Sequence, residues 1–288
     1  MNLFEEIKHN YLQSNQAVKR IIAINVAVFL VLAILNVFAF LFNSSFSTTI
    51  INSYFTLPAS LASFLYRPWS IVTYMFLHSG FLHILFNMLW LYWMGNLLQE
   101  YLGNKRVYQA YFIGGVFGGL VYMLAYNVFP AFTAVKDVSY ALGASAGVLS
   151  VVVAAATLLP NFEIRLMFLG SIKLKWIALV SVGLDLISIP NGNAGGHIAH
   201  LGGALFGYLF IKHLYTNSVF DRLFSVIGNL FSKKSKLKVH YKTNNNTNKP
   251  KSAQTQIDVD EILDKISKSG YESLSKREKE ILFKASNH

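Results

Sequence analysis

The chain contains no cysteine among its 288 residues. Disulfide bonds and thiolate metal sites are therefore excluded, although this absence leaves the cellular compartment open. Charge is also scarce, because Asp, Glu, Lys and Arg make up 14% of the residues while hydrophobic residues make up 53%. Soluble domains carry about 25% charged residues, so the composition favours a membrane protein.

No Lys, Arg, Asp or Glu occurs between Arg20 and Arg67. The N-terminus begins with Glu5, Glu6 and Lys8, which is not the pattern of a cleavable signal peptide. The first apolar run is long enough to span a bilayer. We expect this run to act as its own insertion signal.

Six apolar stretches have the length of roughly 20 residues that a membrane-spanning helix needs. The fifth is short and contains Asp185. The connection at about 43–76 is too polar to span but rich in Phe, Tyr and Trp, so we expect it to lie at the membrane interface. The predicted fold is an all-α polytopic bundle, with spans near residues 20–42, 77–98, 106–128, 141–159, 174–190 and 196–215.

Along the chain, connections rich in Lys and Arg alternate with connections that contain few of them. The positive-inside rule then places both termini in the cytoplasm and brings spans two, four and six in from the outer face. The inner segments carry Lys8, Lys19, Arg20, Lys105, Arg106, Arg165, Lys173 and Lys175, whereas the outer connections carry only Arg67 and Lys136.

Spans two, four and six each carry polar residues near their start: His83 with Asn87, then Ser145, then His197 with His200. Ionisable side chains are costly at membrane depth, so several of them on one side of the bundle indicate a functional site. Asn87 follows His83 by four residues, which puts both on one helix face.

Gly203 and Gly207 follow His200 at three and seven residues and form a small-residue stripe on its face. Such stripes let helix backbones approach closely in lipid. A close approach of the fourth and sixth spans would bring the His200 ring near the Ser145 hydroxyl, as activation of a nucleophile by a base requires.

These motifs resemble those of the rhomboid intramembrane serine proteases over residues 60–215: His-x-x-x-Asn on the second helix, Gly-x-Ser on the fourth, and His before a Gly-rich stretch on the sixth. The resemblance implies that Ser145 is the nucleophile and His200 the base of a Ser-His dyad with no third acidic member. It implies that His83 and Asn87, with the Ser145 backbone amide, hold the oxyanion, and that neither cofactor nor metal is needed.

The implied enzyme is a serine endopeptidase that cleaves transmembrane protein substrates near the outer membrane face. The resemblance also matches Trp69 to an aromatic residue of the family's first loop. An Arg often follows that tryptophan, but Ser70 stands there in this chain, and Arg67 is the candidate substitute.

Other polar and small residues are interpreted as supporting the site. Gly143 and Gly147 lie two residues to either side of Ser145, so we expect them on the side of that helix opposite to its hydroxyl, packed against another helix. His78 is expected to bond within the turn before the second span. His197 is a supporting residue at the outer surface, and Asp185 is a satisfied helix-contact carboxyl.

Two alternatives remain open. One is a catalytically inactive rhomboid-like protein that binds transmembrane segments. The other is an intramembrane metalloenzyme or metal transporter that uses histidines, against which the sequence shows no His-Glu-x-x-His motif and no nearby liganding carboxylate. Its candidate ligands are His78, His83, His197 and His200.

The predicted domains are a cytoplasmic N-terminal segment (1–19), the membrane domain (20–215), a basic segment and flexible linker (216–256) and a helical hairpin (257–288). Ser275 and Glu278 form a candidate capping box. The net charge of +11 favours contact with anionic lipids rather than nucleic acid. The extension resembles those of some bacterial rhomboids, which implies the bacterial cytoplasmic membrane. Oligomeric state and natural substrate are not determined by the sequence.

Overall fold

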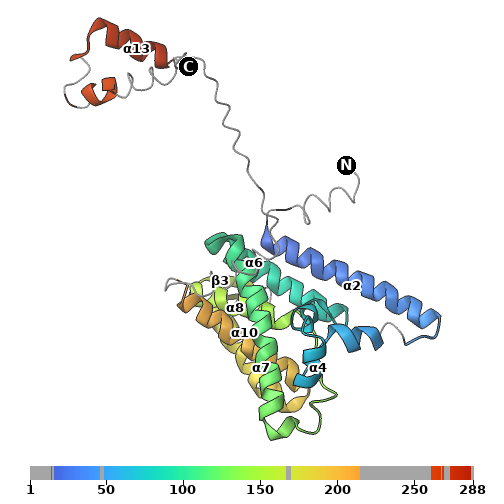
Figure 1. Cartoon of the computed structure of the whole chain (residues 1–288). Coiled ribbons are helices and arrows are strands. Elements are labelled where there is room, and N and C mark those ends of the chain that lie inside the picture. The colour runs from blue at the N-terminus through green and yellow to red at the C-terminus, as the bar shows by residue number, and fades with distance from the viewer. Residues whose placement is uncertain are drawn as a thin grey trace. The chain divides into compact units, whose positions relative to one another are not determined.

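The computed structural model describes residues 14, 16–45, 49–166, 170–214, 261–266, 268 and 273–286 (Figure 1). The chain divides into two compact units, Met1–Ser232 and Lys233–His288. Most of the predicted N-terminal segment and the whole predicted linker lie outside the described residues. The described part of the larger unit is a helical bundle, which confirms the all-α prediction.

Helical segments occur in all six predicted stretches. Four helical runs of the described residues are long and apolar enough to cross a membrane: Ala17–Leu41, Phe81–Val128, Leu174–Asn191 and Ala194–Lys212. The protein is therefore a multi-pass membrane protein, while the count of six crossings stays a prediction. The elements are α2 (Ala17–Leu41), α6 (Phe81–Tyr108), η4 (Gln109–Ile113), α7 (Gly114–Val128), α8 (Ser145–Leu158), α9 (Leu174–Ser188), η6 (Ile189–Asn191) and α10 (Ala194–Lys212).

The run Phe81–Val128 is interrupted inside α6. Gly103 has φ 76° and ψ 172°, a conformation that no helix contains. Glycine adopts it without the steric cost that a Cβ would add. The chain therefore changes direction near this residue, and the run consists of two helices rather than one long one.

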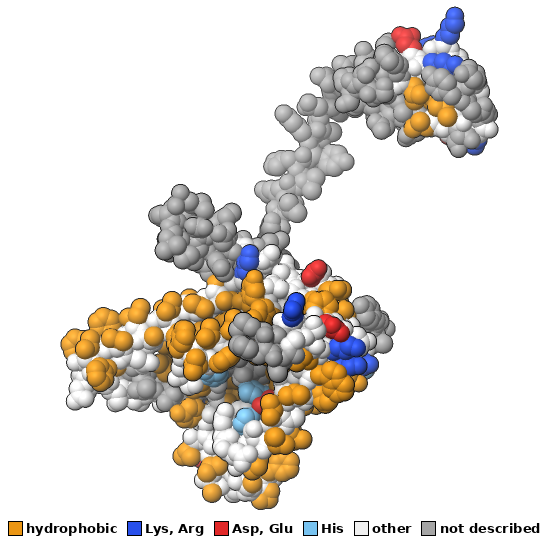
Figure 2. Space-filling model, turned by 180° about the vertical axis from the view of Figure 1, so that it is seen from behind, with side chains coloured by type: hydrophobic (Ala, Val, Ile, Leu, Met, Phe, Trp, Pro, Cys, Tyr) orange, Lys and Arg blue, Asp and Glu red, His pale blue; other side chains and the backbone are white. Residues whose placement is uncertain are grey.

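Helix α2 is attached to α6 through its first turn. The backbone N–H of Ala17 donates to Asn104 Oδ1 over 2.9 Å, and that of Val18 donates to Gln99 Oε1 over 3.2 Å. These donors have no partner within their own helix. Further along α2, large apolar side chains such as Val31 are more than half exposed. Figure 2 shows hydrophobic side chains over much of the visible surface, as expected for a face in contact with lipid.

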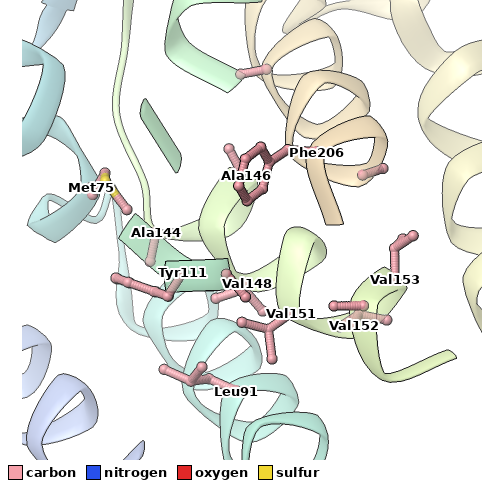
Figure 3. Packing of buried hydrophobic residues seen from close by; sticks show 14 of the residues in the cluster. Met75, Leu91, Tyr111, Ala144, Ala146, Val148, Val151, Val152, Val153 and Phe206 are labelled. Carbon is pink, nitrogen blue, oxygen red and sulfur yellow. The ribbon is translucent and has the colours of Figure 1, made fainter. Parts of the chain in front are cut away.

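The core lies where α7, α8 and α10 meet, and small residues allow their backbones to touch. A Cβ on Gly203 would collide with the carbonyl oxygen of Ala146, and one on Gly207 would collide with that of Ser150. The predicted close approach of the fourth and sixth helices is confirmed. Figure 3 shows the buried apolar side chains around α8, among them Val151.

The predicted interfacial connection is folded. Trp69 Nε1 donates to the Tyr54 carbonyl over 2.8 Å, and the Arg67 guanidinium donates to the Ser53 carbonyl. Both contacts tie the later part of the connection to its earlier part. Its elements are η2 (Ile51–Phe55), β1 (Leu57–Pro58), α4 (Leu61–Tyr66), α5 (Ser70–Thr73) and η3 (Tyr74–Phe76).

Two short antiparallel strand pairs were not predicted. β1 pairs with β2 (Tyr140–Ala141) in the register Leu57↔Ala141, and β3 (Glu163–Leu166) pairs with β4 (Gly170–Lys173). Because β2 is extended, the fourth helix begins at Ser145 and not near residue 141 as predicted. The turn η5 (Pro130–Phe132) lies between α7 and β2.

The smaller unit contains helical residues 261–266 and α13 (Lys276–Ser286). The predicted capping box is present: Ser275 N–H donates to Glu278 Oε2 over 2.7 Å, and Glu278 N–H donates to Ser275 Oγ over 3.3 Å. Lys265 Nζ lies 2.8 Å from Glu278 Oε1. The Lys265 ammonium and the Ser275 donors stabilise the carboxylate and lower the pKa of Glu278 to about 2.

Candidate active site

Ser145 is the first residue of α8, and the turn before it sets its position. Gly143 has φ 130°, a conformation that other residues rarely adopt, and its N–H donates to the Tyr74 carbonyl over 2.9 Å. A Cβ on Gly143 would lie 3.3 Å from Ser145 Oγ and 3.1 Å from His83 Nε2. The expectation that Gly143 faces away from the hydroxyl is therefore wrong, because the residue precedes the helix. Gly147 does face another element, since its Cβ would lie 2.7 Å from the Tyr111 carbonyl oxygen.

The Ser145 hydroxyl contacts the His200 ring. Ser145 Oγ lies 2.6 Å from His200 Nε2, although the two residues are 55 positions apart in the chain. Ser145 comes from α8 and His200 from the second turn of α10. The backbone contact between these helices holds the pair together, as the glycine spacing predicts.

Asp185 on α9 contacts both histidines of α10. Its Oδ1 lies 2.8 Å from His200 Nδ1 and 2.7 Å from His197 Nδ1. The expected dyad had no acidic member, so the structure adds a carboxylate that the sequence interpretation treated as a helix contact. The available signal was the occurrence of a carboxylate inside an apolar span.

His83 and Asn87 lie on one face of α6, as their spacing predicts. Asn87 is buried, and its Nδ2 donates to the His83 carbonyl over 3.0 Å. The Nδ1 of His83 lies 3.4 Å from the Ser79 N–H, which can only donate, and 3.0 Å from Ser79 Oγ. With Nδ1 accepting, Nε2 carries the proton of the neutral ring and serves as a donor on the Gly143 side.

A cavity of about 220 Å³ lies beside these groups. Its wall contains the polar side chains of Ser145, Asp185 and His200 together with apolar side chains of α6 and α8, so the cavity has both reactive groups and an apolar surface. Its lining residues are Asn87, Trp90, Ser145, Val148, Leu149, Val152, Ser181, Asp185 and His200. In Figure 2 histidine side chains lie next to an acidic one within the apolar surface.

The other two candidate histidines, His78 and His197, do not contact Ser145 in the described part of the chain. The His78 ring packs edge-on against His83, with ring centroids 5.0 Å apart. Its nitrogens are buried and interact with the backbone of Phe76, in the turn before α6, so the expected bond within that turn stays a prediction. His197 instead shares the Asp185 carboxylate with His200.

One group of side chains has the donors of a metal site. Atoms of Asp185, His197 and His200 lie within 4.8 Å of one another. The sequence interpretation found no carboxylate near the histidines, and this was wrong. Asp185 lies on α9, and only the packing of α9 against α10 brings its carboxylate to His197 and His200. The expected ligands His78 and His83 are not part of this group.

Comparison with known proteins identifies the larger unit. The Rhomboid domain family model matches residues 66–217, which is more than half of the chain. A second model, described as a family of unknown function (DUF6576), matches residues 241–288.

Several curated proteins are similar. RHOMBOID-like protein 12, mitochondrial, of Arabidopsis thaliana is 29% identical over 148 residues, covering 48% of this chain and 44% of that protein. Presenilin-associated rhomboid-like protein A, mitochondrial, of Danio rerio is 32% identical over 141 residues, covering 48% and 35%. Rhomboid protease GlpG of Serratia proteamaculans is 35% identical over 65 residues, covering 18% and 23%.

The chain spans less than half of the length of each of these relatives. The family assignment rests on the domain match together with the helical membrane fold. On these grounds, the chain belongs to the rhomboid family.

Proposed function

We propose that the protein is an intramembrane serine endopeptidase that cleaves transmembrane segments of other membrane proteins near the outer membrane face. The observation that carries the proposal is the 2.6 Å contact between Ser145 Oγ and His200 Nε2 at the cavity. A hydroxyl hydrogen-bonded to an imidazole nitrogen is the arrangement of an activated serine nucleophile. The family relationship supports the same reaction class.

The reaction is acyl transfer to water. His200 Nε2 takes the Ser145 proton while Oγ attacks the peptide carbonyl, and His200 then gives that proton to the departing amine. A water molecule, deprotonated by His200, hydrolyses the resulting ester and restores the Ser145 hydroxyl. These two side chains are sufficient for proton transfer in both acylation and deacylation.

The developing oxyanion requires donors. The N–H of Ser145 is at the start of α8, where backbone N–H groups have no helical partner and the helix dipole favours negative charge. His83 Nε2–H and the second N–H of the Asn87 amide are the proposed side-chain donors. Each such donor contributes about 3–4 kcal/mol in serine hydrolases.

The substrate must be locally unwound. A regular transmembrane helix uses its carbonyls in its own hydrogen bonds, so cleavable segments should contain helix-breaking residues. The resemblance implies small residues at the cut. The proposed location is a bacterial cytoplasmic membrane, with both termini cytoplasmic and the basic tail near anionic lipid.

A metal-dependent function is the second candidate, favoured by the group formed by Asp185, His197 and His200. It conflicts with the serine mechanism at one atom. A neutral imidazole that binds a metal through Nδ1 keeps its proton on Nε2, and His200 could then no longer accept the Ser145 proton. The two functions therefore predict opposite responses to chelators.

The test is incubation of the purified protein with a panel of labelled transmembrane segments. Cleavage should occur, resist a metal chelator, and disappear in Ser145→Ala. The matched control is Ser171→Ala, which removes an exposed hydroxyl on β4 and should cleave normally. If the unmodified protein and Ser145→Ala bind the segments equally and neither cleaves them, the protein is instead an inactive segment-binding protein.

A further inference from the structure

Asp185 is isolated from other formal charges along the sequence. No Lys, Arg, Asp or Glu other than Asp185 occurs between Lys175 and Lys212. Its side chain is only 13% exposed, in a helix whose exposed side chains are mostly apolar. An ionised carboxylate in such surroundings is costly unless it is hydrogen-bonded. The two histidines of α10 supply those hydrogen bonds.

The contact with His200 fixes the tautomer of the ring. An ionised carboxylate oxygen can only accept, so at 2.8 Å from Asp185 Oδ1 the Nδ1 of His200 carries a hydrogen. The Nε2 of a neutral ring is then unprotonated and accepts the Ser145 hydroxyl at 2.6 Å. The base is therefore held in the one neutral form that can take the proton.

His197 makes a second hydrogen bond to the Asp185 carboxylate. Its Nδ1 donates to Oδ1 over 2.7 Å, and the same oxygen also accepts the hydrogen bond from His200. Since His197 and His200 both belong to α10, the two bonds fix α9 against α10 at the level of the nucleophile.

We propose that Asp185 is a positioning residue for the reaction, so that the site operates as Ser145–His200–Asp185 rather than as a dyad, with His197 steadying the carboxylate. This inference rests on the proposed function. Asp185 keeps its negative charge while His200 holds the transferred proton, and it stabilises the imidazolium that forms. The proton never passes to Asp185.

The first measurement separates rate from binding. Asp185→Asn keeps the shape of the side chain and removes its charge, so kcat should fall roughly 10- to 1,000-fold with KM nearly unchanged, less than the about 10,000-fold seen for a chymotrypsin-type aspartate. Asp185→Glu should recover part of kcat because it restores the charge. Asp137→Asn is the matched control, since this exposed loop aspartate undergoes the same chemical change.

The second measurement does not require a substrate. A fluorophosphonate reacts when Ser145 Oγ attacks phosphorus, fluoride leaves and the hydroxyl proton passes to His200. Its labelling rate should fall in Asp185→Asn in parallel with kcat. Labelling that depends on Asp185 in a protein that cleaves no segment would leave the positioning role standing while the proposed function fails.

Comparison with His197→Ala tests whether Asp185 acts only as a structural contact. That variant should keep most of kcat, because the Asp185–His200 bond remains. If His197→Ala and Asp185→Asn lose equal activity with equal loss of thermal stability, Asp185 serves helix packing and the proposal is overturned. Unchanged kcat and labelling in Asp185→Asn would overturn it as well, whatever the fate of Ser145→Ala.

Discussion

Gly203 of α10 lies directly against the backbone carbonyl of Ala146, the residue that follows Ser145 on α8. A Cβ at Gly203 would collide with this carbonyl, which belongs to the first turn of α8. Because Gly203 follows His200 by three residues, this contact sets the distance between the base and the nucleophile.

We therefore expect Gly203→Ala to separate α8 from α10 and lower proteolytic activity at least tenfold, with overpacking that costs about 1–3 kcal/mol of stability. Thermal unfolding in detergent and cleavage assays would measure both effects. The matched control is Gly183→Ala on α9, where an added Cβ meets nothing within 4 Å. Normal activity in Gly203→Ala would show that the helix contact does not position Ser145 and His200.

The two histidines of α10 should differ in their effect on proteolysis. His200→Ala removes the only ring that contacts Ser145 among the described residues and should abolish cleavage, whereas His197→Ala should retain much of it. Cleavage of one labelled segment by the purified variants would measure the difference. An active His200→Ala beside an inactive His197→Ala would mean that the base is misassigned.

Asn87 should act on the transition state rather than on substrate binding, because a donor aimed at a developing charge gains most when that charge exists. Asn87→Ala should lower kcat roughly ten- to a thousandfold and leave KM near its original value. His83→Ala should act in the same direction, and the double variant should lose less than the sum because both donors serve one oxygen. Weakened binding at an unchanged rate would instead make Asn87 a substrate contact.

Membrane orientation can be tested with reporter fusions. The distribution of positive residues places Lys173 inside and Lys136 outside. A reporter joined after Phe231 should therefore report the cytoplasm, and one inserted beside Lys136 should report the opposite side. An external signal from the Phe231 fusion would reverse the assignment of the active site to the outer face.

The sequence by itself determined the features that are local to one element. Composition and the length of the apolar runs indicated a multi-pass helical membrane protein, because burial in lipid demands about 20 apolar residues in a row. The capping box of Ser275 and Glu278 was readable because both residues belong to one helix start. The spacing of Gly203 and Gly207 behind His200 likewise predicted a close helix contact.

The tertiary structure alone decided what depends on elements distant in sequence. The role of Asp185 required α9 to lie beside α10, since no spacing links it to Ser145. The start of α8 at Ser145 required β1 to pair with β2, which holds residues 140–141 extended although the predicted fourth span includes residue 141. Local periodicity shows which face of an element is buried, but the identity of the neighbour is set by packing between elements, and the third member of this site is such a neighbour.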